Sequence, residues 1–435
     1  MGAIPRDQEQ YIRNNYTMSN NNTTPIPTNW YQTTLGGTAT AMYSGGTPLT
    51  SEPGYYGGNI PWLRTQEVNF NYINTTEMKI SDQGLKESSA RWVPENSVVI
   101  AMYGNSAGRV AYSNIPLTTN QACCNIVTDT NKADPKFIFF NLENRYKELE
   151  GMANGGAQQN LSVGVLKKVS MMLPPLQEQK EIAAILSSLD DKIELLRQEN
   201  KTLESIAKSL FKHWFVDFEF PNEEGEPYKS SGGKMIPSEL GPIPEGWRVE
   251  PLDTIADFLN GVASQKYPPK NVIDYLPVIK IKEMNSGITK ESDKASKDID
   301  PKYIVKSGDM LFSWSGSLDI CLWSGVEGVL NQHLFKVTSE KYPKWFYFYW
   351  LMRHLPEFRA IAAGKSTTMG HIQRHHLTDA KVIIPNKTFL TNSDIGFSPL
   401  FEKQIWNNQQ VQILIKLRDT LLPKLMKGEI RVKYQ

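Results

Sequence analysis

Three clusters of residues have the types that enzymes use, but none has the spacing that its chemistry requires. The segment 364–366 (GKS) resembles the end of a phosphate-binding loop, yet Arg359 stands where that loop needs its first glycine. His371 and His375 are one helical turn apart, without the glutamate or further ligand of a metal site. The segment 77–79 (EMK) has the order of a nuclease carboxylate and lysine but lacks a preceding aspartate. With no methyltransferase signature or glycine-rich cofactor loop either, we predict no catalytic residue, metal site or cofactor in this chain.

The composition describes a protein with real hydrophobic cores and no global charge signal. The 435 residues exceed one ordinary domain, 40% of them are hydrophobic, and the formal net charge is +1. Cys123, Cys124 and Cys321 form neither a disulfide framework nor a metal pattern. Residues 1–24 are rich in polar residues and lack the apolar core of a signal peptide, so we expect a flexible tail. No apolar run is long enough to cross a membrane, and we expect a cytoplasmic protein.

The most regular stretch of the chain is 174–218, which begins with two prolines and continues as a heptad pattern. Apolar or small side chains recur at alternating steps of four and three, and charged side chains occupy the positions between them. About 40 residues at 1.5 Å each predict a rod of roughly 60 Å, and a seam this narrow requires a partner helix. Asn200 stands at a seam position, where a polar side chain often fixes the register of two helices. The alternative is a solvent-facing Asn200.

The partner helix is expected in the second half of the chain, because the two halves of the sequence are similar to each other. The segment 25–30 (PIPTNW) matches 242–247 (PIPEGW), and 61–69 (PWLRTQEVN) matches 277–285 (PVIKIKEMN). The end of the first long helix matches residues 414–425, so a second long helix is expected to pack antiparallel against the first. The predicted seam residues are Ile182, Leu186, Leu189, Ile193, Leu196, Asn200, Leu203 and Leu210 in the first helix and Val411, Leu414 and Leu421 in the second.

The repeat predicts an α+β fold, in which two similar β-rich domains are separated by two long helices packed as an antiparallel coiled coil. We expect strands at 98–102 and 310–314, helices at 137–149 and 345–355, and closing strands at 167–173 and 380–384. The expected boundaries are a tail at 1–24, the first domain at 25–173, the first helix at 174–219, a linker at 220–241, the second domain at 242–386 and the second helix at 387–430. A break is expected in the second helix at Ser398-Pro399, and its end near Gly428.

Three stretches resemble a known family. The segments 173–218 (LPPLQEQKEIAAILSSLDDKIELLRQENKTLESIAKSLFKHWFVDF) and 398–432 (SPLFEKQIWNNQQVQILIKLRDTLLPKLMKGEIRV) are similar to the central and C-terminal regions of type I restriction-modification specificity (S, or HsdS) subunits. The segment 241–261 (GPIPEGWRVEPLDTIADFLNG) resembles the start of a target-recognition domain of that family. The similarity covers nearly the whole chain from Pro25 onward, and the two-fold repeat is also the layout of the family.

The resemblance implies that each globular domain reads one half of a split double-stranded DNA sequence and that the coiled coil sets the spacing of the half-sites. It implies a non-catalytic subunit that recruits two methyltransferase (M) subunits and, with them, restriction (R) subunits. S-adenosylmethionine, ATP and Mg²⁺ would then belong to the partner subunits. Apolar residues at the helix ends, among them Phe211, Phe215 and Leu425, either dock the M subunits or are buried against the recognition domains.

With DNA as the implied ligand, polar loop segments of the two domains are the candidates for base contacts. Asn, Gln and Arg can make paired hydrogen bonds to base edges, and glycines let the backbone approach closely. The candidate DNA-binding residues are Tyr103, Asn105, Ser106, Arg109, Asn154, Gln158, Gln159, Asn160, Trp314, Ser315, Ser317, Lys365, Ser366, Thr367, Thr368, His371 and Arg374. The alternative for each segment is a surface turn without a ligand. The pairs at 120–121 and 331–332 (both NQ) recur in the two halves, so we expect them to be structural or to contact phosphate.

A function from another class fits the same duplication. A non-catalytic adaptor could use two similar domains to bind protein partners. A preference for one bipartite DNA sequence over scrambled DNA distinguishes the two functions.

Overall fold

The computed structural model describes residues 16–18, 27–154, 161–271, 273–364 and 370–433. The chain forms two compact units: unit 1 combines 1–192 with 415–435, and unit 2 comprises 193–414. Each unit contains a β-rich domain and a part of both long helices, which confirms the predicted α+β duplication. Within the described ranges, no helix is both long and apolar enough to cross a membrane.

Unit 1 is built on a five-stranded sheet whose central strand is fully buried. The strand order is β3 (Ala39–Ser44), β10 (Cys123–Thr128), β7 (Val98–Ala101), β8 (Val110–Ser113) and β5 (Asn71–Ile73). Only the β5–β8 pair is parallel among these pairs of strands. All four residues of β7 are buried, as expected of an apolar run with strands on both sides. A smaller sheet has the order β6 (Met78–Ile80), β4 (Tyr56–Leu63) and β9 (Thr118–Thr119).

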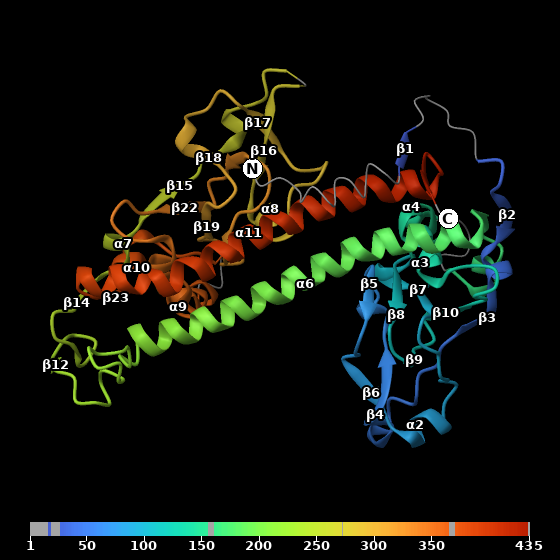
Figure 1. Cartoon of the computed structure of the whole chain (residues 1–435), viewed down its shortest axis with the longest axis horizontal. Helices are drawn as coiled ribbons and strands as arrows, with labels where there is room; N and C mark the ends of the chain where they lie inside the picture. The colour runs from blue at the N-terminus through green and yellow to red at the C-terminus, as the bar shows by residue number, and fades with distance from the viewer. Residues whose placement is uncertain (1–15, 19–26, 155–160, 272, 365–369, 434–435) are drawn as a thin grey trace. The chain divides into compact units, whose positions relative to one another are not determined.

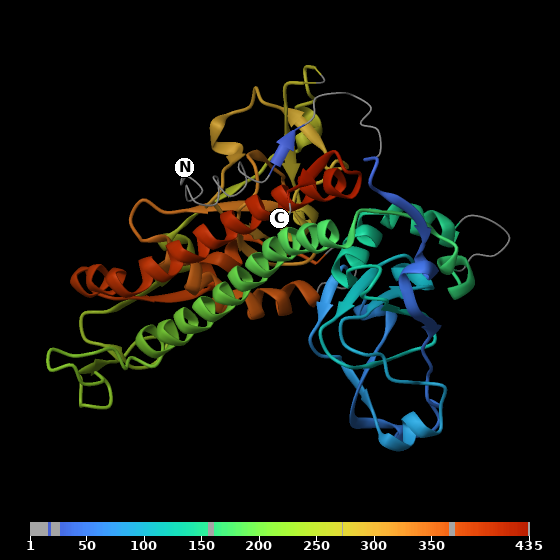
Figure 2. The same cartoon turned by 45° about the vertical axis from the view of Figure 1, so that its right-hand side comes forward.

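Two helices of unit 1 cover the five-stranded sheet where a single helix was predicted. They are α3 (Pro135–Asn144) and α4 (Tyr146–Asn154). The Asp134 carboxylate accepts a hydrogen bond from the backbone N–H of Phe137 at 2.9 Å, and Pro135 opens α3. Phe137 and Phe140 pack against side chains of β7 and β8 in the main core of the unit. Figure 1 shows β5, β7, β8 and β10 of this sheet together below α3, and Figure 2 shows the same cartoon turned by 45° about the vertical axis.

Unit 2 carries two four-stranded sheets. The first has the order β15 (Asp257–Asn260), β22 (Leu334–Thr338), β19 (Met310–Ser313) and β20 (Ile320–Leu322), all antiparallel. The second has the order β17 (Lys294–Ser296), β16 (Tyr275–Ile279), β21 (Gly328–Leu330) and β18 (Ile304–Val305). The long helix α9 (Lys344–Ala363) packs on the first sheet, where the rings of Phe358 and Phe312 are 6.0 Å apart. The helix predicted at 345–355 is therefore longer at its C-terminal end, where it continues to Ala363.

The two units share one topology. In unit 1, β10 pairs with β3 and β7; in unit 2, β22 pairs with β15 and β19. The parallel pair β4–β9 corresponds to β16–β21. The predicted closing strands are β11 (Ser170–Leu173), which pairs with β2 (Tyr31–Thr34), and β23 (Lys381–Ile384), which pairs with β14 (Arg248–Pro251). The two units also share the way one short helix begins. The Glu67 carboxylate accepts a hydrogen bond from the backbone N–H of Arg64, and the Glu283 carboxylate accepts one from the backbone N–H of Lys280, each at 3.2 Å.

Two 40-residue helices, α6 (Leu176–Phe215) and α11 (Lys387–Met426), contribute to both units. In unit 1, the Arg418 guanidinium donates to the Asp190 carboxylate at 2.9 Å. In the same unit Arg431, just beyond α11, donates to the carboxylate of Glu178 at 2.6 Å. The residue numbers rise along one helix as they fall along the other, so the helices run antiparallel in this unit.

In unit 2 the same two helices meet through a polar layer. The Asn200 amide donates to Asn408 Oδ1 at 2.7 Å and to the Gln404 carbonyl at 3.2 Å, while the Asn407 amide donates to Asn200 Oδ1 at 2.9 Å. Asn200 therefore lies in the seam rather than in solvent. Among the predicted seam residues, Ile182, Leu186, Ile193, Leu196 and Val411 are buried, and Leu189, Asn200, Leu203, Leu210, Leu414 and Leu421 are half-buried.

The apolar ends of the two helices are buried within the units. Phe211 and Phe215 stack at 4.9 Å, and Phe215 lies 5.8 Å from Phe397 of α11 in the core of unit 2. Leu425 and Met426 belong to the main core of unit 1. Of the two alternatives for these side chains, the structure shows burial against the domains.

The expected break at Pro399 is wrong, because α11 continues through that residue without interruption. Pro399 and Ile395, whose carbonyl loses its intrahelical partner, are both exposed residues. Phe397 and Phe401, on either side of the proline, are buried in the aromatic core of unit 2. Packing of these two rings outweighs the local cost of the proline. The helix ends at Met426, with Gly428 at a φ of 71°, as predicted for its C-terminal stop.

Two expectations about the ends of the domains also need correction. Residues 16–18 form strand β1 (Tyr16–Met18), which pairs antiparallel with β24 (Ile430–Val432), while the rest of the predicted tail lies outside the described residues. The predicted linker 220–241 is packed onto unit 2. Phe220 is buried and stacks on Tyr228 at 4.6 Å and on Trp247 at 5.1 Å. Aromatic burial thus overrides a composition typical of a linker.

Candidate nucleic-acid interface

In unit 2 the hairpin between β19 and β20 contains three of the predicted DNA-binding residues, of which Ser317 is exposed, Trp314 is half-buried and Ser315 is buried. Ser313 is fully buried, and its hydroxyl donates to the Ser317 carbonyl at 2.7 Å while accepting from the backbone N–H of Asp319 at 2.7 Å. The backbone of Ser313 also donates to the Asp319 carbonyl at 2.9 Å. Gly316 at the tip has a φ of 67°, which favours glycine, and Ser317 beside it is exposed. The hairpin tip is therefore an ordered, solvent-facing loop.

A second segment of unit 2 joins the hairpin through backbone pairing. Gly316 N–H donates to the Gly370 carbonyl at 2.8 Å, and Ile372 N–H donates to the Trp314 carbonyl at 3.0 Å. Ser315 and His371 consequently form an antiparallel bridge, and the rings of Trp314 and His371 lie 6.3 Å apart. The structure thus brings together two segments that are more than 50 residues apart in the sequence.

Two of the predicted side chains, Trp314 and Arg374, are partly engaged inside unit 2. The indole N–H of Trp314 donates to Asn260 Oδ1 at 3.0 Å. The guanidinium of Arg374 donates to the Phe258 carbonyl at 3.1 Å and lies 5.6 Å from the centre of the Phe335 ring. Arg374 is nevertheless exposed on one side and keeps donors available to a ligand. Lys365, Ser366, Thr367 and Thr368 lie outside the described residues.

His333 completes the cluster, although the sequence analysis did not select it. Its Nδ1 is 3.0 Å from the Ser315 hydroxyl, and its Nε2 is 3.3 Å from the Gln332 amide nitrogen. The only available sequence signal was its position directly after the repeated NQ pair. That pair was expected to be structural or to contact phosphate, and Asn331 does have a structural role: it is buried and its side chain accepts from His333 N–H at 3.2 Å. The repeated NQ pair therefore marks a turn, and the residue that follows it, His333, contacts Ser315 of the hairpin.

The corresponding hairpin of unit 1 connects β7 to β8. Tyr103 and Asn105 are exposed at its tip, and Ser106 is half-buried. Gly104 and Gly108 have φ values of 72° and 81°. A Cβ on Gly108 would lie 2.9 Å from the backbone nitrogen of Glu150 in α4, so a glycine is required where the hairpin meets this helix. Asn154 is the last residue of α4, and Gln158, Gln159 and Asn160 lie outside the described residues.

Arg109 is held by its own unit more firmly than a free base-reading side chain would be. Its guanidinium donates to Asn69 Oδ1 at 3.0 Å, and its proximity opposes the rise in the pKa of the Tyr146 hydroxyl. The Tyr146 hydroxyl donates to the Glu150 carboxylate at 2.6 Å. This bond raises the pKa of the Tyr146 hydroxyl and is the first cause that lowers the pKa of the Glu150 carboxyl. Arg109 thus belongs to a connected polar group between the hairpin and α4.

The described residues show no alternative chemistry for these loops. Across the described ranges, no cluster of three or more His, Cys, Asp or Glu side chains could hold a metal ion. Burial raises the pKa of the Cys124 and Cys321 thiols to about 12, so both are protonated at neutral pH. What the loops offer is hydrogen-bond donors and acceptors, exposed aromatic edges and one exposed guanidinium, which is the chemistry of groove contacts with DNA.

Comparisons with known proteins agree with the duplicated architecture. The family model described as the type I restriction modification DNA specificity domain matches this chain twice, over residues 27–205 and 244–389. The type I restriction enzyme MjaIX specificity subunit of Methanocaldococcus jannaschii is 32% identical over 412 residues, which cover 89% of this chain and 91% of the relative. The type I restriction enzyme HindI specificity subunit of Haemophilus influenzae is 22% identical over 365 residues, covering 70% of this chain and 79% of the relative.

A solved structure shows the same fold. The S subunit of a type I restriction-modification system from M. genitalium aligns with a TM-score of 0.59, over 94% of this chain and 98% of that one. The sequence identity is 14%, so this likeness concerns the fold alone.

Proposed function

Because the chain belongs to the type I restriction-modification DNA specificity family, we propose that each of its two units recognises one half of a bipartite double-stranded DNA sequence. The observation that carries this proposal is a shared framework with different loop tips. Both units place a hairpin between corresponding strands, β7–β8 and β19–β20. The tips differ in sequence, 103–109 (YGNSAGR) against 314–319 (WSGSLD). Equal frameworks with unlike polar tips are expected of two readers of different sequences.

The long helices α6 and α11 have the second role in the proposal, to set the spacing of the two half-sites. Each helix has 40 residues, which corresponds to about 60 Å at 1.5 Å per residue. That length is nearly two turns of B-DNA at about 34 Å per turn. Joining two weak readers makes the second contact intramolecular, so that the pair binds far more tightly than either alone.

The same helices are proposed to recruit the partner subunits. Five large apolar side chains remain exposed on them within unit 2, namely Leu195, Ile206, Ile395, Trp406 and Ile413. Ile206 lines an open groove of about 450 Å³ together with Ser205, Ser209, Leu210 and His213. Exposed apolar side chains of this kind suit a protein partner. The proposed partners are two methyltransferase (M) subunits and, through them, restriction (R) subunits.

In this proposal the chain itself catalyses no reaction. Methylation of adenine with S-adenosylmethionine, and cleavage driven by ATP and Mg²⁺, are carried out by the partner subunits. The complex acts in the cytoplasm, where it meets DNA. The formal net charge of +1 fits this division, since a neutral reader depends on local contacts and on its partners for affinity to DNA.

The test begins with the DNA sequence that the complex modifies. Mapping methylated adenines in cells that carry this chain and its M subunit is expected to give one bipartite motif with a fixed gap. The purified complex should then bind that duplex at physiological salt in preference to DNA with either half scrambled. Each single mismatch should cost about 1 to 3 kcal/mol of binding free energy. Binding without sequence preference would instead support the adaptor function and contradict the proposal.

A further inference from the structure

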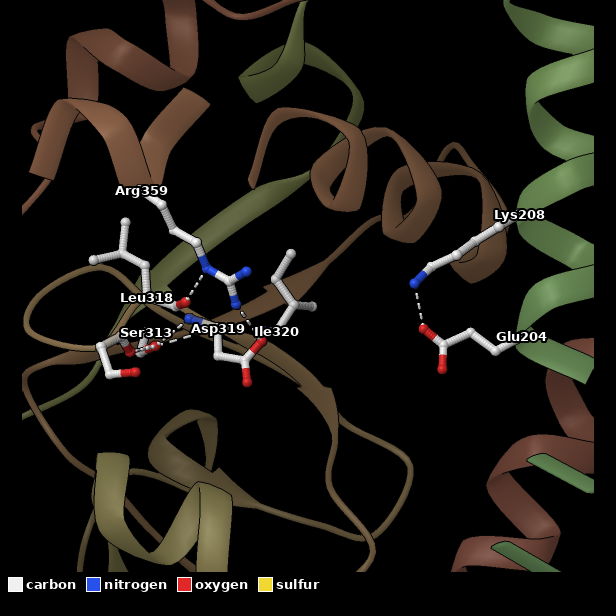
Figure 3. A network of polar contacts seen from close by, with 8 residues as sticks. Glu204, Lys208, Ser313, Leu318, Asp319, Ile320 and Arg359 are labelled. Atoms are coloured by element: carbon white, nitrogen blue, oxygen red, sulfur yellow. Dashed lines mark hydrogen bonds and ion pairs between the residues drawn. The ribbon is translucent and has the colours of Figure 1, made fainter. Parts of the chain in front are cut away.

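The reading hairpin of unit 2 is connected to helix α9 by one arginine. Arg359 donates from Nε to the Leu318 carbonyl at 2.9 Å and from Nη2 to Asp319 Oδ1 at 3.2 Å. Figure 3 shows its guanidinium reaching from the helix to the backbone and to the carboxylate at the base of the hairpin. The Asp319 carboxylate also accepts from the backbone N–H of Ile320 at 2.9 Å. The hairpin is thus attached to the helix at the point where its second strand begins.

Unit 1 has a connection at the corresponding place. Arg109 directly precedes β8, as Asp319 directly precedes β20, so the two residues occupy equivalent positions in the two hairpins. The helix that follows the sheet supplies the partner in each unit. In unit 1 this helix is α4, which the hairpin meets closely, because a Cβ on Gly108 would lie 2.9 Å from the backbone nitrogen of Glu150. At that point α4 carries the hydrogen-bonded pair of Tyr146 and Glu150. Arg109 lowers the pKa of the Glu150 carboxyl, after the larger effects of Tyr146 and Lys147.

The two connections have opposite polarity. In unit 1 the hairpin carries the cation Arg109, whose charge has a minor lowering effect on the pKa of the Glu150 carboxyl on α4; in unit 2 the hairpin carries Asp319, which forms an ion pair with Arg359 of α9 at 3.2 Å. Exchanging the two charges preserves their attraction. A base-reading role would give no reason for the charge on the helix to change with the charge on the hairpin. The direct contacts of Arg359 in unit 2, with the Asp319 carboxylate and the Leu318 carbonyl, are the geometry on which the inference rests.

We propose that Arg359 and Asp319 are positioning residues, which fix the orientation of the reading hairpin of unit 2 and so determine its discrimination between bases. Arg109 is the counterpart in unit 1. This inference rests on the proposed function, because it assumes that the hairpins read DNA. Base contacts require side chains held within about 0.5 Å of the productive geometry, and a hairpin tip achieves this only if its base is fixed.

Because the ion pair is exposed, its effect on the orientation of the hairpin can be distinguished from an effect on the stability of the fold. The side chains of Arg359 and Asp319 are 53% and 44% exposed, and ion pairs this open contribute little to the stability of a fold. The buried Ser313 hydroxyl closes the hairpin without them. Loss of the pair is therefore expected to leave the fold intact and to loosen the orientation of the tip.

The experiment uses the full chain in complex with its M subunit and the bipartite duplex identified by methylation mapping. Binding is measured for the cognate duplex and for duplexes with single base-pair changes in each half, at several salt concentrations. The variants are Arg359→Ala, Asp319→Ala and the charge exchange Arg359→Asp with Asp319→Arg. Lys234→Ala is the control, because it removes another exposed ion pair of unit 2, with Lys234 Nζ 2.6 Å from Glu245 Oε1, away from the hairpin.

Each single variant is expected to lose discrimination at one half-site by about threefold to tenfold, a fraction of what one base contact provides. Discrimination at the other half-site and the dependence of binding on salt should not change. The charge exchange should recover part of the loss, because it restores the ion pair but not the hydrogen bond to the Leu318 carbonyl. Lys234→Ala should behave as the unmodified chain. If the alanine variants fail to fold, Arg359→Lys tests the same point, since lysine keeps the charge but cannot make both contacts.

Two results would overturn the positioning role. Equal weakening on all sequences, with the salt dependence reduced by about one charge, would make Arg359 a direct phosphate contact. Unchanged discrimination in the variants would remove any role for the pair. Both results differ from failure of the proposed function, in which the unmodified complex shows no bipartite preference at all.

Discussion

Glu143, on α3 of unit 1, is a carboxyl group whose surroundings oppose its charge. Burial is the main cause that raises its pKa, to about 7. The Arg418 guanidinium acts in the opposite direction, but Asp190 and Asp419 add further negative charge nearby. Arg418 is committed to Asp190 at 2.9 Å, so it does not compensate Glu143 fully. The helix pair of unit 1 therefore places a partly protonated carboxyl beside an ion pair at neutral pH.

The raised pKa predicts a pH-dependent stability. A carboxyl whose pKa is higher in the folded than in the unfolded chain binds more protons when folded. Its contribution to the free energy of unfolding is complete below about 4.5, its ordinary pKa, and is lost as the pH rises through about 7. Glu143→Gln replaces this carboxyl with a neutral amide, so the variant does not lose stability through ionisation at this position. We expect the substitution to raise the free energy of unfolding at pH 8 by about 1 to 3 kcal/mol and to change it little at pH 5.

Urea denaturation of the full chain at several pH values measures this difference. Glu148→Gln is the matched control, because the Arg145 guanidinium lowers the pKa of the Glu148 carboxyl. The ionised form of Glu148 therefore stabilises the fold, whereas the ionised form of Glu143 destabilises it. That variant should gain no stability at pH 8. Parallel pH profiles for the Glu143 variant and the unmodified chain would contradict the prediction.

The candidate site could be predicted as segments but not as side chains. Polar, glycine-containing loops were identifiable in the sequence, and the structure places Trp314, Ser315 and His371 in one cluster. The role of Arg109 depends on Tyr146 and Glu150, which lie in another element and show no signal in the loop itself. A single loop sequence cannot distinguish a free donor from one that is already engaged inside the fold.

Among the elements, α11 contains a local conflict between sequence and packing. Pro399 lies inside the helix and lacks the N–H that would bond the Ile395 carbonyl. Ile395 is 81% exposed and Pro399 is also exposed, so neither contributes much to the core. The helix is maintained by the buried rings of Phe397 and Phe401, with Phe397 stacked on Trp345 at 4.3 Å. The proline is thus tolerated at a cost to stability.

Pro399→Ala is expected to remove that cost. Alanine restores the missing hydrogen bond and has the highest helix propensity, so the free energy of unfolding should rise by about 1 to 3 kcal/mol. Chemical denaturation of the full chain measures the change. Pro343→Ala is the control, because Pro343 caps α9 at a φ of −64°, where proline is already favourable. A Pro399→Ala variant no more stable than the unmodified chain would show that another interaction at this turn requires the proline.

The same element shows which parts of the fold are predictable. The heptad pattern and the repeat were sufficient for the two helices, because both are properties of the sequence itself. The continuity of α11 depends on aromatic contacts with α9, and β1 depends on pairing with residues 430–432. Such long-range contacts can reverse a local preference, so the proline break was predicted wrongly and the strand at residues 16–18 was not predicted.

At the scale of the whole molecule, the proposed function needs a device that defines the gap between the two half-sites. The loops of either unit define only local contacts. The length of the α6–α11 pair is the property of the chain that can define a gap. Two contacts keep the helices in register: Asp190 with Arg418 in unit 1, and Asn200 with Asn407 in unit 2. Residues 191–199 of α6 and 408–417 of α11 lie between these contacts.

Adding one heptad to each helix between the two register contacts should lengthen the gap in the recognised DNA. The additions duplicate 191–197 in α6 and 411–417 in α11, which repeats the seam residues Ile193, Leu196, Val411 and Leu414 and keeps the seam continuous. Seven residues at 1.5 Å each add about 10 Å, which corresponds to up to about three base pairs. Methylation mapping in cells that carry the lengthened chain should show the same two half-sites with a wider gap.

The controls for this experiment separate helix length from chain length. Seven residues inserted at the exposed turn 230–232, outside both helices, should leave the gap unchanged. A heptad added to α6 alone moves Asn200 out of reach of Asn407 unless the seam slips, so it should reduce binding rather than widen the gap. If the doubly lengthened chain methylates the original sequence with its original gap, the helices do not measure the distance between the half-sites, and the spacing must come from the partner subunits.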